Sequence, residues 1–379
     1  MRLIRTIHPV GQGGFYTESI KDDSGKEFLV AYDCGGNNKQ FMEDYLESFI
    51  HDSRDGGKMV IDAVFISHLH ADHINGLEYL LKKVDVKYLF LPRLTNELLV
   101  ETLLYNTLQN HENAQELTDF ILKLYDERNG DYYETRIVQV DHSEGQGGGN
   151  QEGQNNSVDI NNISQSLIES GKNITFSPDI QWLYIPYNPP ANHRSTTDFY
   201  NFLKAELDLT SLDFSRIPEI VEDCSISKLK DVYKRFFGSN HNSYSMTLFS
   251  GLRDSSRYKI KGSHHVWNLD CDIQYHLHQT SANCLYTGDF EARAFNDMRL
   301  FYGHLWPTIE SIQVPHHGSK NNIHPSLYDN AIRGFISVGT ENKYSHPHKM
   351  TLIELYNQGC LPIVVTEDEW TKFVSYYSF

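Results

Sequence analysis

Three histidines and one aspartate fall within six consecutive residues, in the order His68-x-His70-x-Asp72-His73. On an extended turn, His68 and His70 can direct their imidazoles to one side, while Asp72 and His73 address a second point nearby. Imidazole and carboxylate are ligands that suit Zn²⁺, Mn²⁺ or Fe. A surface loop of four unrelated polar residues is a poorer interpretation, because a hydrophobic run comes directly before them. The spacing therefore predicts a pair of metal ions, about 3.5–4 Å apart, that share one hydroxide.

Further metal-ligand residues stand far along the chain, each close to the end of a predicted strand. They are Asp289, at the end of Leu285-Tyr286-Thr287-Gly288-Asp289, the pair His316 and His317, and His346. Each also has an ordinary alternative, namely a turn residue, a paired loop histidine or a helix cap. If the strands lie in one layered structure, these residues meet the first cluster at a common edge.

The elements that must position these residues are strands alternating with helices. Met59–Ser67 is a near-continuous apolar run, which is typical of a buried strand, and it leads directly into the histidine cluster. A helix is expected over 76–83. Other strands are predicted at Leu3–Val10, Glu27–Tyr32, Val86–Leu91, 136–142, Ile180–Tyr187, 244–250, 257–262, 283–287, 310–314, 334–338 and 362–366, and other helices over 38–51, 291–303 and 348–357.

Three segments interrupt this series. Residues 94–135 and 190–240 carry mainly helical patterning and are interpreted as insertions. Residues 143–157 are rich in Gly, Gln, Asn and Glu and nearly free of apolar residues, so a flexible loop is expected. The whole chain, 1–379, is expected to form a single domain around these insertions.

The ordered motifs resemble those of the metallo-β-lactamase superfamily, and most closely the ComEC/Rec2 competence-type hydrolase domain. The resemblance covers 3–92, 136–187 and 240–366, and its motifs are H-x-H-x-D-H, Val10-Gly11-Gln12-Gly13-Gly14, Tyr32-Asp33-Cys34-Gly35, Asn242-Ser243-Tyr244-Ser245, Thr287-Gly288-Asp289, His316-His317-Gly318-Ser319 and Tyr344-Ser345-His346-Pro347-His348. One departure is that no clear third histidine precedes Asp289. His241 lies where competence-type relatives often have Asn.

The resemblance implies an αββα sandwich, in which two mixed sheets pack face to face with helices outside. It also implies that Asp289 bridges two divalent cations, Zn²⁺ or Mn²⁺. One cation would be held by His68, His70 and a later histidine, with His316 the candidate, and the other by Asp72, His73 and another later histidine, with His346 among the candidates. His317 or His346 would donate a hydrogen bond to the developing charge or leaving oxygen. Asp72 would also orient the nucleophile, and Asp33 would support the ligand loop. We expect His111, His193, His264 and His265 to be exposed or packing residues.

The function that follows is that of a metal-dependent hydrolase. The resemblance points to a phosphodiesterase or nuclease that uses a hydroxide shared by the two metals. The alternatives are a small-molecule esterase, of phosphocholine or lactone type, and a catalytically silent binding subunit. Residues 94–135 or 190–240 would be the places for a partner protein. No G-x-S-x-G elbow and no phosphate-binding P-loop occurs in the sequence.

Composition narrows the substrate further. Lys and Arg number 33 against 50 Asp and Glu, which gives a net charge of −17. A broad basic face for duplex nucleic acid is therefore not expected, and a small or single-stranded substrate is more plausible. The 5 cysteines are widely spaced without a C-x-x-C pair, which favours reduced thiols. No apolar run has the length of a membrane span and the first residues lack a signal-peptide core, so a cytoplasmic protein without membrane contact is expected.

Overall fold

The computed structural model describes residues 1–52, 58–109, 113–126, 131–132, 134–143, 156–176, 181–190, 193–206, 214–223, 226–237, 245–254, 258–266 and 281–379. Almost all of the predicted loop 143–157 lies outside these residues, and so do His111 and His241. The side chains of His193 and His265 are outside the description as well.

The larger sheet has ten strands and is antiparallel at one end and largely parallel at the other. Its order is β13 (Lys261–Val266), β18 (Phe373–Ser378), β1 (Arg2–Ile7), β2 (Tyr16–Lys21), β3 (Glu27–Tyr32), β4 (Val60–Phe65), β5 (Asp85–Pro92), β7 (Thr135–Val140) and β6 (Asp131–Tyr132), with β9 (Leu167–Ile168) also paired to β7. Strands β3, β4, β5 and β7 run parallel to one another.

The smaller sheet has eight strands. Its order is β17 (Leu361–Val365), β16 (Arg333–Ser337), β15 (Ile309–Gln313), β14 (Asn283–Tyr286), β12 (Thr247–Leu252), β11 (Trp182–Tyr187), β10 (Asn173–Thr175) and β8 (Ser157–Asp159). Strands β14 to β17 are parallel, and β11 and β12 pair with antiparallel register. Both sheets are therefore mixed.

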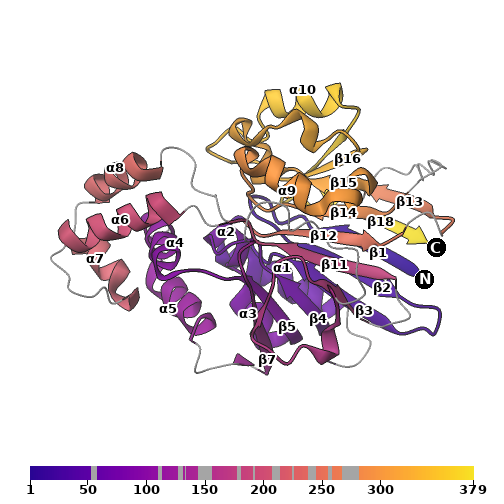
Figure 1. The fold of residues 1–379 in the computed structure, drawn as a ribbon, viewed down its shortest axis with the longest axis horizontal. Coiled ribbons are helices and arrows are strands. Elements are labelled where there is room, and N and C mark those ends of the chain that lie inside the picture. The colour runs from indigo at the N-terminus through magenta and orange to yellow at the C-terminus, as the bar shows by residue number, and fades with distance from the viewer. Residues whose placement is uncertain are drawn as a thin grey trace.

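The two sheets pack face to face, and helices cover their outer faces (Figure 1). Between the sheets lies a core rich in aromatic side chains, which includes Tyr32, Phe65, Trp182 and Tyr286. Helices α1 (Lys39–Asp52) and α3 (Leu77–Lys83) pack on the larger sheet, and α9 (Phe295–Tyr302) and α10 (Lys349–Asn357) pack on the smaller one. Because β4 is covered on both faces, its sequence is apolar almost throughout. The predicted αββα arrangement is confirmed.

Five helices from the two predicted insertions lie together beside this sandwich (Figure 1). They are α4 (Asn96–Gln109), α5 (Ala114–Leu124), α6 (His193–Glu206), α7 (Ile217–Asp223) and α8 (Ile226–Phe237). Helix α4 contacts α5, α6 and α7, and α6 contacts α8. The segments 94–135 and 190–240, far apart in sequence, thus share one helical layer.

Six of the described strands were not expected from the sequence, namely β2, β6, β8, β9, β10 and β18, and one predicted strand is displaced. Strand β18 inserts between β1 and β13, and β2 pairs with both β1 and β3. The strand expected over 257–262 is found at Lys261–Val266, where β18 supplies its partner. Strand formation depends on the neighbouring strand that supplies the pairing, and local sequence does not identify that neighbour.

Three cysteines, Cys34, Cys284 and Cys360, are buried free thiols, as the sequence predicted for them. Of the helices in the described ranges, none combines the length and the apolar character that a membrane crossing requires.

A buried ion pair within the larger sheet is the centre of a hydrogen-bond network that joins this sheet to the smaller one. Arg5 Nε donates to Glu18 Oε1 at 2.7 Å, and both side chains are almost fully buried. Glu18 also accepts hydrogen bonds from the hydroxyls of Tyr184 and Tyr286, each at 2.8 Å, and from Ser250. Because Arg5 lies on β1 and both tyrosines lie on the smaller sheet, this network fixes how the sheets register against each other.

Replacement of Arg5 by Met should therefore strongly destabilise the fold, because Glu18 would keep a buried charge without its cation. We expect the free energy of unfolding to fall by about 3–5 kcal/mol in urea titrations. The control is Lys82→Met, which breaks the exposed pair of Lys82 with Glu78 at 2.8 Å and should cost less than about 1 kcal/mol. Equal losses in the two variants would contradict the structural role given to Arg5.

Candidate metal centre

The site lies where parallel strands of both sheets end. His68, His70, Asp72 and His73 follow β4, and Asp33 follows the neighbouring β3. In the smaller sheet, Asp289 follows β14, and the His316–His317 pair follows β15. The two edges are tied together by the backbone, because Met246 N–H donates to Ser67 O at 2.7 Å. Loops at the carboxyl ends of parallel strands meet at one edge, which brings these distant residues together.

Six of these side chains form two groups of three. His68, His70 and Asp289 form one group, and Asp72, His73 and His317 form the other. Within each group the ligand atoms lie within 4.8 Å of one another. The sequence prediction that Asp289 meets the first cluster across the fold thus agrees with the geometry.

Asp289 faces both groups, one through each carboxylate oxygen. Its Oδ2 lies 3.8 Å from His68 Nε2, whereas its Oδ1 lies 3.2 Å from His73 Nε2 and 3.7 Å from His317 Nε2. Asp72 Oδ2 in turn lies 3.4 Å from His317 Nε2. Asp289 therefore contacts side chains of both groups.

Three imidazoles are oriented through the ring nitrogen that points away from the centre. His317 Nδ1 donates to the carbonyl of Ser337 at 2.8 Å, which leaves Nε2 without a proton in the neutral ring. His73 Nδ1 lies 2.8 Å from Asp33 Oδ2, and His68 Nδ1 lies 2.9 Å from Ser67 Oγ. We assign the same tautomer to these two rings, with Nε2 toward the centre. Such outer contacts are what holds metal-binding histidines in place.

The residues fit a pair of divalent cations. The Nε2 atoms of His68, His73 and His317 are buried, and within the described part of the chain they make no hydrogen bond. A buried polar atom without a hydrogen bond is costly unless something else binds it. Imidazole nitrogens together with carboxylate oxygens are a donor set for Zn²⁺ or Mn²⁺.

Burial and neighbouring charged groups have opposite effects on the pKa values of the carboxylates at the centre. Burial alone would raise the pKa of Asp289, but the imidazoles of His316, His73 and His317 outweigh it and hold that pKa well below its usual value. The same competition lowers the pKa of Asp72, beside His73 and His317. Burial lowers the pKa of His70 to about 3, so this ring is neutral at pH 7.

The loop that carries Asp289 is held by close contacts and an unusual backbone. Gln313 Oε1 accepts from the N–H groups of Thr287 and Gly288, each at 2.9 Å. Gly288 has a φ of +54°, and a Cβ at this position would lie 2.5 Å from the Cβ of Ser67. A glycine is therefore required there. Ser245 Oγ accepts from the Asp289 N–H at 3.0 Å, which fixes the aspartate backbone beside His68.

Other predicted residues take distinct places around the two groups. Asp33 lies behind His73 and also accepts from the Ser67 N–H at 2.7 Å, in the supporting position that was expected for it. His316 lies at the rim, with Nε2 3.9 Å from Asp289 Oδ2. His346 is further out, with its ring centre 5.7 Å from that of His316. His317, which with His346 was one of two candidates for a hydrogen-bond donor, lies in the second group beside Asp72 and His73.

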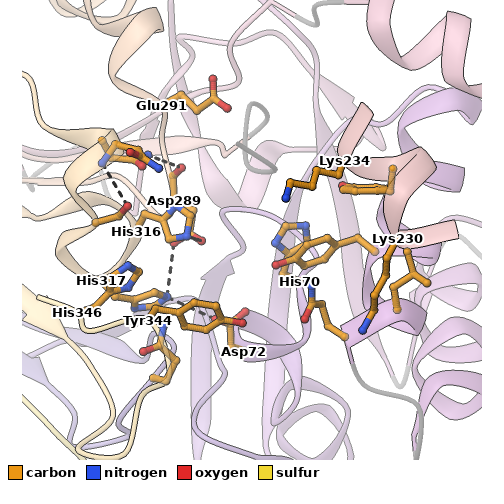
Figure 2. A pocket seen from close by; sticks show the side chains of 18 residues that line it. His70, Asp72, Lys230, Lys234, Asp289, Glu291, His316, His317, Tyr344 and His346 are labelled. Carbon is orange, nitrogen blue, oxygen red and sulfur yellow. Dashed lines mark hydrogen bonds and ion pairs between the residues drawn. The ribbon is translucent and has the colours of Figure 1, made fainter. Parts of the chain in front are cut away.

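A cavity of about 460 Å³ opens from the centre. Figure 2 shows His70, Lys230 and Lys234 on one wall, and Asp289, His316, His317, Tyr344 and His346 on the other. The tyrosine ring of Tyr105 stacks on His70 at 4.0 Å between ring centres, and Tyr233 follows at 5.9 Å from Tyr105.

Sequence analysis did not identify Lys230, Lys234, Tyr105 or Tyr233 as site residues. The available signal was the i, i+4 spacing of the two lysines on a helix whose other face is apolar. Of the histidines expected to lie elsewhere, His264 is half-buried against Ser375 and Arg333, away from the cavity.

Comparisons with known proteins find a partial match to one family model and several distant similarities. A family model described as "Anti-Pycsar protein Apyc1" matches residues 13–187, which is less than half of the chain. Ribonuclease J of Mycoplasma genitalium is 32% identical over 77 residues, covering 19% of this chain and 13% of that protein. The chain therefore spans only a small part of this relative.

Three solved structures with metallo-β-lactamase or nuclease names are similar to this chain. YhfI from Bacillus subtilis, a metallo-β-lactamase fold protein, is 8% identical with a TM-score of 0.39, over 96% of this chain and 97% of its own. The long form of RNase Z from yeast is 10% identical with a TM-score of 0.32, over 92% and 38%. The B3 metallo-β-lactamase BLEG-1 is 17% identical with a TM-score of 0.17, over 23% and 35%. Since these scores are low, the fold rests on the topology of the chain itself.

The wall that carries the lysines contains a buried acid, Glu101, which should make the stability of the fold depend on pH. Burial raises the pKa of Glu101, on α4, to about 7 from its ordinary value of 4.5, although the Tyr233 hydroxyl donates to it and acts in the opposite direction. Between these two pH values the folded chain keeps a proton that the unfolded chain has lost. Stability from this group is therefore full below about pH 4.5 and is lost as the pH rises through 7.

In the Glu101→Gln variant, the loss of stability with rising pH should disappear. Relative to the variant, the wild type should lose on the order of 3 kcal/mol of unfolding free energy between pH 5 and pH 8. Urea titrations across this range measure the difference, with Glu97→Gln, one turn earlier on the same helix, as the control. Parallel pH profiles for wild type and Glu101→Gln would show that Glu101 is not a buried acid.

Proposed function

We propose that the chain is a metal-dependent phosphodiesterase, with nucleic acid as its substrate. The observation that carries this proposal is the position of Asp289, which presents one carboxylate oxygen to each of two groups of ligand-type side chains. Resemblance to the competence-type hydrolase domain and the names of the ribonucleases to which the chain is similar support the choice of substrate.

The proposed ligands follow the two groups. His68, His70 and Asp289 would hold one cation, and Asp72, His73 and His317 the other, with Asp289 shared. His316 stands at the rim, where it would complete the first set. Zn²⁺ and Mn²⁺ are both compatible with a set of imidazole and carboxylate ligands. When bound, the two cations would supply an activated water at neutral pH and neutralise charge on the phosphate.

The chain's own residues orient the reaction. Hydrolysis forms a bond from the water oxygen to phosphorus and breaks the bond to the leaving oxygen, which takes up a proton. Asp72 is partly open to the cavity, with its side chain 34% exposed, and would accept a hydrogen bond from the attacking water. His346 lines the same cavity, and burial among the histidines lowers its pKa to about 4. Its ring is therefore neutral at pH 7 and would donate an N–H to the leaving oxygen.

Activity on a panel of substrates tests this proposal. Purified protein with Mn²⁺ or Zn²⁺ should cleave single-stranded DNA, RNA or bis-p-nitrophenyl phosphate. Turnover of a lactone or another small ester alone would favour a small-molecule esterase. Full metal occupancy without any turnover would favour a silent binding subunit.

Asp289→Asn, which is nearly isosteric, should leave folding intact and lower turnover by at least about 100-fold, because the amide cannot supply two anionic oxygens. Elemental analysis should find less metal per chain than in the wild type, as it also should in the His68→Ala/His70→Ala variant. Near-normal turnover and metal content in Asp289→Asn would remove Asp289 from the shared position.

Asp33→Asn tests the support of His73 from behind the centre. Asn can still accept from Ser67 N–H but no longer provides a carboxylate for His73 Nδ1. Metal affinity, measured by competition with a chelator, should fall by about 10- to 100-fold. Asp62→Asn, a carboxylate on β4 that contacts Lys87 at 2.7 Å, is the control and should keep wild-type affinity. An unchanged affinity in Asp33→Asn would contradict the supporting role.

A further inference from the structure

Two lysines of helix α8 face the cavity in a chain that is strongly acidic overall. Lys230 and Lys234 are exposed and line the cavity, although the net charge of the chain is −17. Among the described residues neither lysine makes an ion pair with a carboxylate. Cations left without internal partners at the mouth of a metal-ligand site are suited to an anion from outside.

Both lysines lie on the side of the helix that lines the cavity. Residues four apart on a helix lie on the same side, about 5–6 Å apart between Cβ atoms. The adjacent side of α8 is anchored by Leu229 and Tyr233, which are buried, and the Tyr233 hydroxyl donates to Glu101 on α4. A row of neighbouring rings, from Tyr233 through Tyr105 to His70, then connects α8 to the first ligand group. The lysines are thus placed by a packed wall.

Their place in the cavity separates them from the atoms that react. Figure 2 shows Lys230 and Lys234 on the side of His70, while Asp289, His317 and His346 line the opposite side. A phosphate between the two ligand groups would therefore leave the lysines for a different anionic group of the same substrate. A monoester or a simple diester carries no such second group, whereas a nucleic acid strand carries a phosphate on either side of the bond to be broken.

An aromatic ring on the opposite rim suits the same type of ligand. The side chain of Tyr344 is 62% exposed, lines the cavity and stacks on His346 with 5.7 Å between ring centres. Exposed aromatic rings beside cations are the combination by which proteins bind single strands, since every base can stack. A duplex would meet the acidic remainder of the surface and is disfavoured.

We propose that Lys230 and Lys234 form a second anion site, which binds a non-scissile phosphate of a single-stranded oligonucleotide and so selects polymers over small diesters. This inference rests on the proposed phosphodiesterase function for the position of the scissile phosphate. The lysines are binding residues and take no part in the reaction itself.

Binding can be measured on the full-length, metal-loaded protein with a fluorescent phosphorothioate octathymidylate, which keeps its charge and resists hydrolysis. In Lys230→Gln/Lys234→Gln the dissociation constant should rise about tenfold. The slope of log affinity against log salt should decrease by about 0.7, because each phosphate neutralised on a single strand contributes about 0.7. The control Lys58→Gln/Arg235→Gln removes the same charge, one cation being on α8 but outside the cavity lining, and should leave both values unchanged.

Cleavage provides a second comparison. The ratio of kcat/KM for the normal octamer to that for bis-p-nitrophenyl phosphate should fall about tenfold in the lysine variant, mainly through KM. An unchanged salt slope, an equal loss on both substrates, or equally tight binding of a mononucleotide would each overturn the inference. If the wild type binds the octamer through these lysines but cleaves neither substrate, the second anion site stands and the proposed function fails.

Discussion

The burial of several carboxylates and imidazoles in one site is the constraint on which the rest of this structure depends. Asp289 and Asp72 are negative groups in a place where burial opposes charge, and only the surrounding imidazoles keep their pKa values low. Such a cluster is stable only when each member is held by further contacts and when positive charge is present. The hydrogen bonds that the outer ring nitrogens donate to Ser337, Asp33 and Ser67, and the contacts of Gln313 and Ser245, meet the first requirement.

The architecture explains how residues so distant in sequence reach that point. Parallel strands in both sheets end at a common edge, and the sheets are locked in register by the Arg5–Glu18 network between them. The αββα sandwich thus supplies two sets of strand ends, one carrying the H-x-H-x-D-H cluster and the other carrying Asp289 and the histidine pair. The helices of the two insertions add a wall that the sandwich alone lacks. This wall carries Lys230 and Lys234, the two side chains that we propose as the second anion site.

Sequence analysis found the parts of the centre that are local in the chain. His68 to His73 could be predicted as site residues because a buried strand and a short turn fix their relative positions. Asp289 could be predicted from the strand end before it. The sequence did not predict that His316 lies at the rim while His317 lies in the second group, since these positions depend on a left-handed backbone conformation at both residues. Lys230 and Lys234 were missed for a different reason. Their relation to the cavity is set by packing of α8 against distant helices, and local patterning does not contain it.

Backbone conformation around the cavity has a consequence for how this chain can change over time. Asp33, His316, His317 and Ser345 all have positive φ values, between +53° and +56° at three of them and +51° at His316, although none is glycine. Each costs roughly 1–3 kcal/mol that glycine would avoid. Substitution of glycine at these positions would thus stabilise the fold, but at His316, His317 and Asp33 it would also remove a side chain from the centre. Selection for chemistry and selection for durability pull against each other at these positions.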